Sequence, residues 1–251
     1  MMLTRIRAGW AGAAVAAVAV FTLCSCGSTV GANSATSAST APRTAEASVA
    51  TSSKKLDPLA FVYAQGAETK SFTVTSAASA YSDLTDPDIS PFRLVATCLG
   101  TTVEPPIAAG DGVGLSLNDG EVAVNSSTQI VSPAQRARDD ETLRDPRFGS
   151  CFQQTLVDWV KGAGEPNDAV HWGEVAPRNA RVPAGASARV LFALPILDNA
   201  TNQQVQVMVI DVVFLSSGQI EDQLSVTSLA NPANDLVLTA TAQMAGKLKQ
   251  Q

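Results

Sequence analysis

The sequence predicts an α+β domain in which helices cover an antiparallel β-sheet. Helical segments with capping residues dominate the middle of the chain, four β-rich runs follow them, and an amphipathic helix closes the chain. The connections between the β-rich runs are short, which favours antiparallel pairing over crossover connections. With 251 residues, of which 45% are hydrophobic, the chain is long enough to form one sizeable core.

Three helices are predicted in the middle of the chain, over 90–100, 132–143 and 147–161. The first two each begin with a serine at the N-cap and a proline at the first helical position. The first ends before a glycine, and the second has a glutamine at the capping-box distance from its serine. The third has apolar residues at helical spacing and stops at two glycines. The residues that carry these signals are Ser90, Pro91 and Gly100; Ser132, Pro133 and Gln135; and Phe148, Cys151, Phe152, Leu156, Trp159, Val160, Gly162 and Gly164.

Strands are predicted where β-rich runs lie between turn residues. Asn118–Asp119–Gly120 separates two alternating runs and is the clearest hairpin signal in the chain. The run 205–215 is apolar on both faces, as in a covered central strand, whereas 219–227 alternates polar and apolar residues, as in a half-exposed strand. Ser216–Ser217–Gly218 joins these two runs into a hairpin. Two further β-rich runs are 169–175 and 188–194, and a closing helix with Leu236, Ala240, Met244 and Leu248 follows Asn231–Pro232.

Residues 1–25 have the organisation of a secretory signal peptide. A short basic region with Arg5 and Arg7 precedes the uncharged run 8–23, and small residues follow it. A bilayer-spanning helix usually takes about 20 apolar residues, so a retained transmembrane helix is the weaker alternative for this alanine-rich run.

The end of the signal, Leu23–Cys24–Ser25–Cys26, resembles the bacterial lipobox. In that motif an aliphatic residue three positions earlier and a small residue immediately before mark a cysteine for lipidation and cleavage. The resemblance implies that Cys26 is the lipidated N-terminus and that Cys24 leaves with the signal. Because two or more acyl chains anchor a protein stably, we expect a location on the extracytoplasmic face of the cell membrane.

Residues 26–56 are predicted to be a lipidated cysteine and a flexible tether, and 57–251 a single globular α+β domain. The segment 27–53 consists mainly of Ser, Thr, Ala and Gly, so it cannot bury enough apolar surface to offset the entropy of ordering. The formal net charge of −6 argues against nucleic acid and against electrostatic binding to anionic lipid, both of which favour clustered Lys and Arg.

Cys98 and Cys151 are predicted to form a disulfide. An exported chain meets an oxidising compartment, and these are the thiols left once Cys24 is removed and Cys26 is acylated. Two buried free thiols are the alternative. Neither cysteine belongs to a C-x-x-C motif, so we expect a structural bridge rather than a redox-active one.

Three stretches, together with the lipobox and the tether, resemble a group of actinobacterial exported lipoproteins. They are a helix that ends in CLG, a hairpin followed by SPAQRARDDETLRDPRFGSCF, and VIDVVFLSSGQIEDQLSVTS before the final helix. The chain is similar in these features to mycobacterial Lpq-type and sensor-like proteins with a PsbP-like domain. The resemblance implies an α/β/α sandwich over most of 56–251 and a non-enzymatic envelope protein, and it carries over no functional residue.

Few residues could carry metal or catalytic chemistry. A zinc site needs several His or thiolate ligands, and the sequence has one histidine, His171. A hydrolase triad would have to recruit His171 without a G-x-S-x-G motif, so His171 beside Trp172 is more simply a strand residue at the rim of the sheet. Asp83, Asp86 and Asp88 lack the glycine and distal glutamate of an EF-hand and indicate a solvated loop. We expect no metal, no cofactor and no catalytic residue.

Asp211 is a carboxylate in the middle of the predicted central strand. A buried carboxylate is costly unless it is paired, so we expect a hydrogen bond or salt bridge to an arginine, with Arg189 as the candidate. The alternative is a polar group at the floor of a ligand cleft. Trp159, His171 and Trp172 would then line the same cleft, although the tryptophans more often belong to a core.

The function that these observations favour is a non-enzymatic binding or sensory module of the cell envelope, tethered to the membrane by its lipid. Its further partner would be an envelope protein or a small ligand. A carrier of an apolar or lipid molecule is the first alternative and would require a large apolar cavity between sheet and helices. A hydrolase of unrecognised type is the second, with His171 and Asp211 as its candidate acid–base pair.

Overall fold

A computed structural model describes residues 56–75, 91–163 and 166–250. The predicted signal peptide, Cys26 and most of the tether lie outside the described residues, as do Ser90 and the three aspartates of 83–88. The helices are α1 (Pro91–Leu99), α2 (Pro133–Arg144), α3 (Phe148–Ala163) and α4 (Asn234–Leu248), with short 3-10 turns η2 (Pro58–Ala60), η3 (Ala67–Thr69) and η4 (Asn118–Gly120). The strands are β1 (Thr73–Thr75), β2 (Ala108–Asp111), β3 (Gly114–Leu117), β4 (Val122–Ile130), β5 (Val170–Trp172), β6 (Ala176–Arg178), β7 (Ala188–Asp198), β8 (Gln204–Ser217) and β9 (Ile220–Leu229).

The strands of the described residues form a nine-stranded sheet in the order β1–β3–β4–β9–β8–β7–β5, with β2 paired to β4 and β6 to β7. Every strand pair is antiparallel. The two predicted hairpins are present: β3 and β4 are joined through Asn118–Gly120, and Ser217 pairs with Ile220 across a turn at Gly218. The predicted α+β class with an antiparallel sheet is therefore confirmed.

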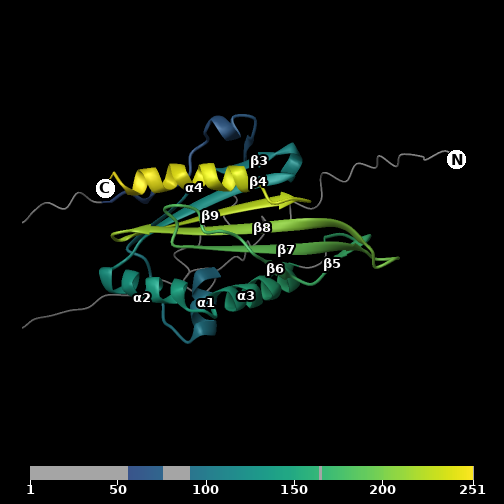
Figure 1. Cartoon of the computed structure of the whole chain (residues 1–251), viewed down its shortest axis with the longest axis horizontal. Helices are drawn as coiled ribbons and strands as arrows, with labels where there is room; N and C mark the ends of the chain where they lie inside the picture. Colours follow the sequence, from purple (N-terminus) through teal and green to yellow (C-terminus); the bar gives the residue numbers. More distant parts are fainter. Residues whose placement is uncertain (1–55, 76–90, 164–165, 251) are drawn as a thin grey trace, which may run out of the picture. The chain divides into compact units, whose positions relative to one another are not determined.

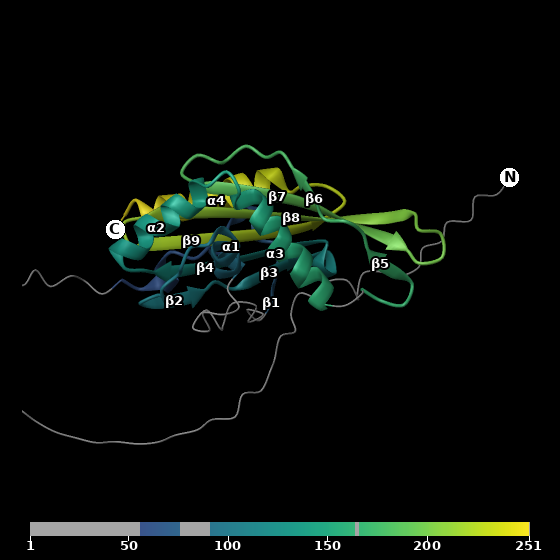
Figure 2. The same ribbon diagram turned by 90° about the horizontal axis from the view of Figure 1, so that it is seen from below.

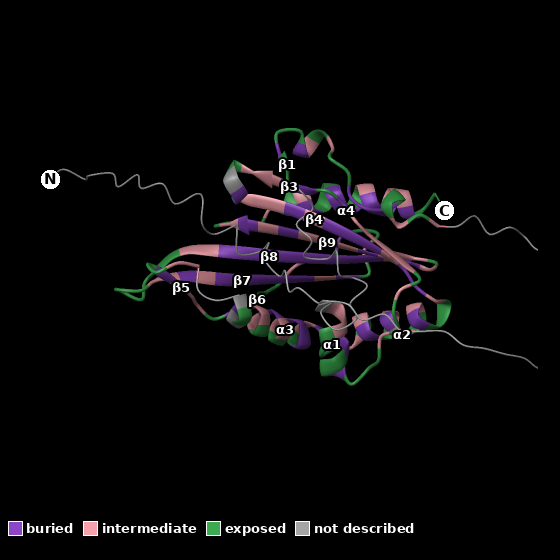
Figure 3. Cartoon of the chain, turned by 180° about the vertical axis from the view of Figure 1, so that it is seen from behind, coloured by how far each residue is buried: buried purple, intermediate pink, exposed green. Residues whose placement is uncertain are grey.

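Helices cover both faces of this sheet. Figure 1 shows α4 on one side and α1, α2 and α3 on the other, and Figure 2 shows the same arrangement from below. The inner strands β8 and β9 are long, and β8 is buried over most of its length (Figure 3). The burial of 208–215 confirms the interpretation of this part of the run as a covered central strand, but Val205 at its start is 54% exposed. Strand β9 alternates buried and half-buried residues as predicted.

Because side chains alternate along a strand, the two faces of each central strand lie in different environments. Met208, Ile210, Val212 and Phe214 of β8 belong to the core cluster with α1 and α3. The odd-numbered residues of β8 point to the opposite face, where α4 packs on β8 and β9.

The core between the sheet and the helices α1 and α3, here called the α3 face, is rich in aromatic rings and lies beside a disulfide. The Phe148 and Phe214 rings meet edge to face with centroids 5.5 Å apart, and Phe152 stacks on Phe192 at 5.9 Å. Cys98 of α1 and Cys151 of α3 form the predicted bridge, with Cα atoms 5.8 Å apart. The bridge fixes α1 against α3 beside these rings.

Two local details differ from the sequence prediction. Ser132 Oγ accepts from Gln135 N at 3.0 Å, but the Gln135 side chain is buried and bonds Glu104 and Asp139 instead of completing a capping box. In α4 it is Val237, rather than the predicted Leu236, that is fully buried.

No helix in the described part of the chain has the length and apolar character needed to cross a bilayer.

Candidate functional site

Arg189 and Asp211 form a buried ion pair on the α4 face of the sheet. Arg189 Nε donates to Asp211 Oδ1 at 2.9 Å, and Nη2 donates to Oδ2 at 2.5 Å. The side chains are 4% and 2% exposed. Arg189 comes from β7 and Asp211 from β8, two adjacent strands. The expected salt bridge between these residues is therefore confirmed, and it satisfies both carboxylate oxygens.

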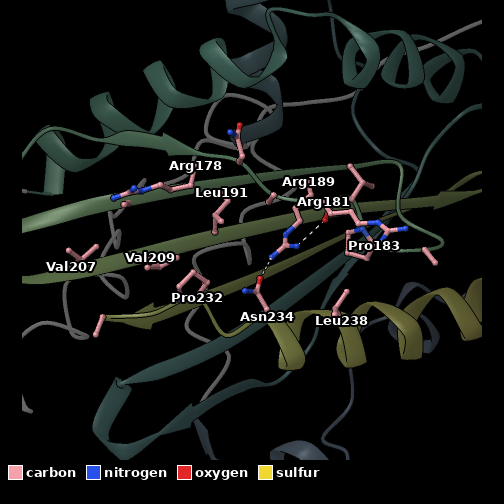
Figure 4. A pocket seen from close by; sticks show the side chains of 16 residues that line it. Arg178, Arg181, Pro183, Arg189, Leu191, Val207, Val209, Pro232, Asn234 and Leu238 are labelled. Atoms are coloured by element: carbon pink, nitrogen blue, oxygen red, sulfur yellow. Dashed lines mark hydrogen bonds between the residues drawn. The ribbon is translucent and has the colours of Figure 1, made fainter.

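The same guanidinium holds two other parts of the chain. Arg189 Nη1 donates to the carbonyl oxygen of Arg181 at 2.9 Å, and Nη2 donates to Asn234 Oδ1 at 2.8 Å (Figure 4). Arg181 lies in the segment 178–184, which starts at the last residue of β6 and runs toward β7, and Asn234 is the first residue of α4. One buried side chain thus fixes the segment 178–184 and the start of α4 over the sheet.

A groove of about 910 Å³ lies around Arg189, which we call the anchor of the groove because it bonds the floor and both walls. Its floor is apolar and comes from β7 and β8, one wall is the segment 178–184, and the other wall is the start of α4 with the residues that precede it (Figure 4). The floor residues are Leu191, Ala193, Val207 and Val209; the walls are Arg178, Asn179, Ala180, Arg181, Val182, Pro183 and Ala184 on one side and Ala230, Pro232, Asn234 and Leu238 on the other, with Arg189 between them.

The charges that line the groove are all positive, although the chain as a whole carries −6. Three arginines line it, and no Asp or Glu is among its lining residues in the described structure. The Arg189 charge is offset by Asp211. Arg178 and Arg181 are exposed, and neither forms a salt bridge with another described residue. The groove therefore presents an apolar floor with two uncompensated cations at its rim.

The four residues proposed from the sequence as one cleft do not come together. Trp159 and Trp172 are half-buried and pack against the core on the α3 face, whereas Asp211 points to the α4 face. His171 lies on the short strand β5, where its Nδ1 donates to Asn199 Oδ1 at 2.6 Å. The prediction of one shared cleft is wrong because both tryptophans pack on the face of the sheet that α3 covers, whereas strand alternation turns Asp211 to the other face.

The residues that do form the groove were missed because the sequence has no motif for them. The available signal was the stretch Pro177–Pro183, which has two arginines and no acid in an acidic chain. Without the register of β6 on β7, nothing in the sequence puts that stretch above Val207 and Val209.

A second polar cluster lies on the α2 face of the sheet. Burial, followed by the repulsion of Asp139, raises the pKa of Glu221 to about 8, and burial also raises the pKa of Asp139. Arg136 approaches both Asp140 and Glu221 and donates to Ser216 Oγ. The cavity beside these groups is about 50 Å³, which has room for ordered water rather than for a ligand. We regard this cluster as a structural network.

Comparison with known proteins shows a distant likeness to a solved structure. No protein-family model matches the chain, and no curated protein is significantly similar to it. One solved structure that resembles it is the extracellular domain of PknH from Mycobacterium tuberculosis, with a TM-score of 0.29 and 10% identity over 71% of this chain and 99% of that chain. A likeness at this level shows neither a shared family nor a shared function.

Proposed function

We propose that this protein is a non-enzymatic binding module whose ligand lies in the groove between the segment 178–184, the strands β7 and β8, and α4. The observation that carries the proposal is the groove itself. Ligand sites are typically concave, of roughly 300–1,000 Å³, and mainly apolar with a few polar groups that fix orientation. A groove of about 910 Å³ with an apolar floor and arginines at its rim has these properties.

The geometry of the anchor supports a groove that exists before the ligand arrives. Arg189 bonds Asp211 in the floor strand, the Arg181 carbonyl in one wall and Asn234 in the other. Because these bonds are internal to the protein, the walls do not have to be ordered by the ligand. A preformed site loses less conformational entropy on binding.

The proposed location is the extracytoplasmic face of the cell membrane. It rests on the signal peptide and on the lipobox resemblance at Cys26. A flexible chain of the length of 27–53 spans roughly 30 Å, which is enough to hold the domain clear of the lipid headgroups. A tethered domain of this kind would present the groove to molecules of the envelope.

The two alternatives receive different support. A carrier of an apolar molecule would use the same groove. Because a carrier shields its ligand from water, the walls would have to enclose the ligand further than they do in this structure. A hydrolase has less support, because both oxygens of Asp211 are bonded to Arg189 and His171 bonds Asn199. These two side chains do not form the acid–base pair that the sequence suggested.

The groove can be tested with Nile red, a neutral fluorescent probe of apolar sites. Val207 is a half-buried floor residue, so Val207→Trp should fill the groove and weaken Nile red binding about tenfold or more. Val113→Trp is the matched control, since Val113 is 46% exposed in the loop between β2 and β3. Equal Nile red binding by wild type and both variants, with unchanged circular dichroism, would contradict the proposal.

A further inference from the structure

We infer that the groove takes a single-chain amphiphile with an anionic headgroup. This inference rests on the proposed function, because it names the class of ligand for the same groove. It follows from the combination of an apolar floor and uncompensated positive charge in a protein that is otherwise acidic. Neither property alone would select this class.

The floor provides the contact for a hydrocarbon chain. Leu191, Ala193 and Val209 are buried in the sheet and present their side chains to the groove, and Val207 extends this surface toward the end of β8. Val182 and Leu238 are 43% and 47% exposed on the two facing walls. Each exposed apolar side chain that a hydrocarbon covers is removed from water, which favours binding in proportion to the area buried.

The rim provides the contact for a negative headgroup. Figure 4 shows Arg178 and Arg181 on the wall formed by the segment 178–184, reaching toward opposite ends of the groove. A guanidinium binds a carboxylate or a phosphate through two parallel hydrogen bonds. Each end of the groove therefore has a cation against which a headgroup can lie while the chain covers the floor.

The surrounding charges favour an anion over a neutral or cationic headgroup. Arg189 adds no net charge because Asp211 neutralises it. The positive end of the α4 dipole also lies at the groove, since Asn234 is the first helical residue and Ala233 at the N-cap has no side chain that accepts from the first turn. Asp235 in that turn opposes the effect, but it is not a lining residue.

A free inorganic anion is a poorer fit than an amphiphile. Exposed arginines on a surface bind isolated anions weakly, because water solvates both partners well. The apolar floor adds nothing to the binding of such an ion. The hydrocarbon chain is thus needed for affinity, and the headgroup for selectivity.

The test is competition against Nile red by four amphiphiles that share a dodecyl-length chain, each below its critical micelle concentration. Dodecanoate and dodecyl phosphate should displace Nile red at concentrations about tenfold lower than neutral dodecyl maltoside or cationic dodecyltrimethylammonium at low salt. This preference should shrink as salt is raised, since ions screen exposed charges. Acetate and inorganic phosphate should displace nothing, and displacement by either would overturn the inference.

Variants separate the charge from the groove. Arg178→Gln/Arg181→Gln should abolish the preference for anions over the neutral and cationic amphiphiles. Arg144→Gln/Lys249→Gln removes the same charge at two exposed sites outside the groove and should keep the preference. At the exposed wall residue Leu238, Leu238→Glu should weaken dodecanoate binding, whereas Leu238→Lys should not.

The outcomes distinguish the two levels of the proposal. If Nile red does not respond to Val207→Trp, the groove is not the site and the proposed function fails. If Nile red responds but the four amphiphiles compete equally, or if the arginine pair can be replaced without effect, the function stands and the anionic class is wrong.

Discussion

Arg189 on β7 and Asp211 on β8 form a two-bond ion pair with both side chains removed from solvent. Burying two charges has a large desolvation cost, which their attraction and hydrogen bonds offset only when the geometry is good. Here the geometry also joins the segment 178–184 and α4 to the sheet. The pair therefore determines the shape of the groove as well as the stability of the sheet around it.

Removal of one partner should be far more harmful than removal of both. Arg189→Met leaves the Asp211 carboxylate buried and unpaired, so we expect the free energy of unfolding to fall by about 3–5 kcal/mol. Arg189→Met/Asp211→Leu should recover a large part of that loss. Urea denaturation of the two single variants and the double variant measures the coupling. If the loss of unfolding free energy in the double variant equalled the sum of the losses in the two single variants, the two charges would not stabilise each other.

The Cys98–Cys151 bridge should contribute a large share of the stability. It closes a loop of 53 residues, and the chain-entropy estimate for such a closure is about 4 kcal/mol, against a typical 5–15 kcal/mol for a domain. Cys98→Ser/Cys151→Ser should lower the melting temperature by many degrees, and a reducing agent should have the same effect on wild type but none on the variant. Two alkylatable thiols in unfolded, unreduced mature protein would show that the bridge does not form in solution.

The proposed lipid attachment can be tested at Cys26. If the lipobox resemblance is right, Cys26→Ala should abolish acyl labelling and either release the protein or leave an unprocessed precursor. Deletion of 27–53 should leave the melting temperature of the domain unchanged, because this segment has almost no apolar surface to bury. Acyl labelling that persists in Cys26→Ala would show that another cysteine carries the lipid.

The fold was largely predictable because local signals and global packing agree. Pro91 and Gly100 bound α1, and Asn118 and Gly120 adopt the positive φ angles, 48° and 98°, that the hairpin connection needs. Apart from Asp211, the run 207–215 of β8 is apolar at every position because this part of the strand is covered on both faces. In these places a residue type and its structural environment correspond directly.

The site was less predictable because it depends on register. The sequence indicated that Asp211 needs a partner, and the choice of Arg189 was correct. It could not show on which face Trp172 lies, since a shift of one residue reverses the direction of every side chain in a strand. It also could not show which face is covered by α3, the helix that carries Trp159. Nor could it show that the segment 178–184, with its two arginines, lies over the apolar residues of β7 and β8.

Asp222 lies on β9 under α4, 2% exposed, and its titration should set part of the pH dependence of stability. Burial raises the pKa of Asp222 to about 7, although a hydrogen bond from Thr128 and the charge of Lys247 oppose the shift. Thr128 Oγ1 donates to Asp222 Oδ1 at 2.6 Å. Between an unfolded pKa near 4 and this value, the folded state binds more protons than the unfolded state, so stability falls as the pH rises.

The expected size of the effect follows from the shift. Wild type should lose about 2–3 kcal/mol of unfolding free energy between pH 5 and pH 8 through this group. Asp222→Asn keeps an acceptor for Thr128 and cannot ionise, so its loss over the same range should be smaller by that amount. The pKa of Glu221, raised to about 8, leaves a residual slope of the same sign. The control is Asp158→Asn, on the exposed side of α3, whose unfolding free energy should follow that of wild type across this pH range in urea denaturation. If the unfolding free energy of Asp222→Asn changed with pH as much as that of wild type, Asp222 would ionise normally in the folded protein.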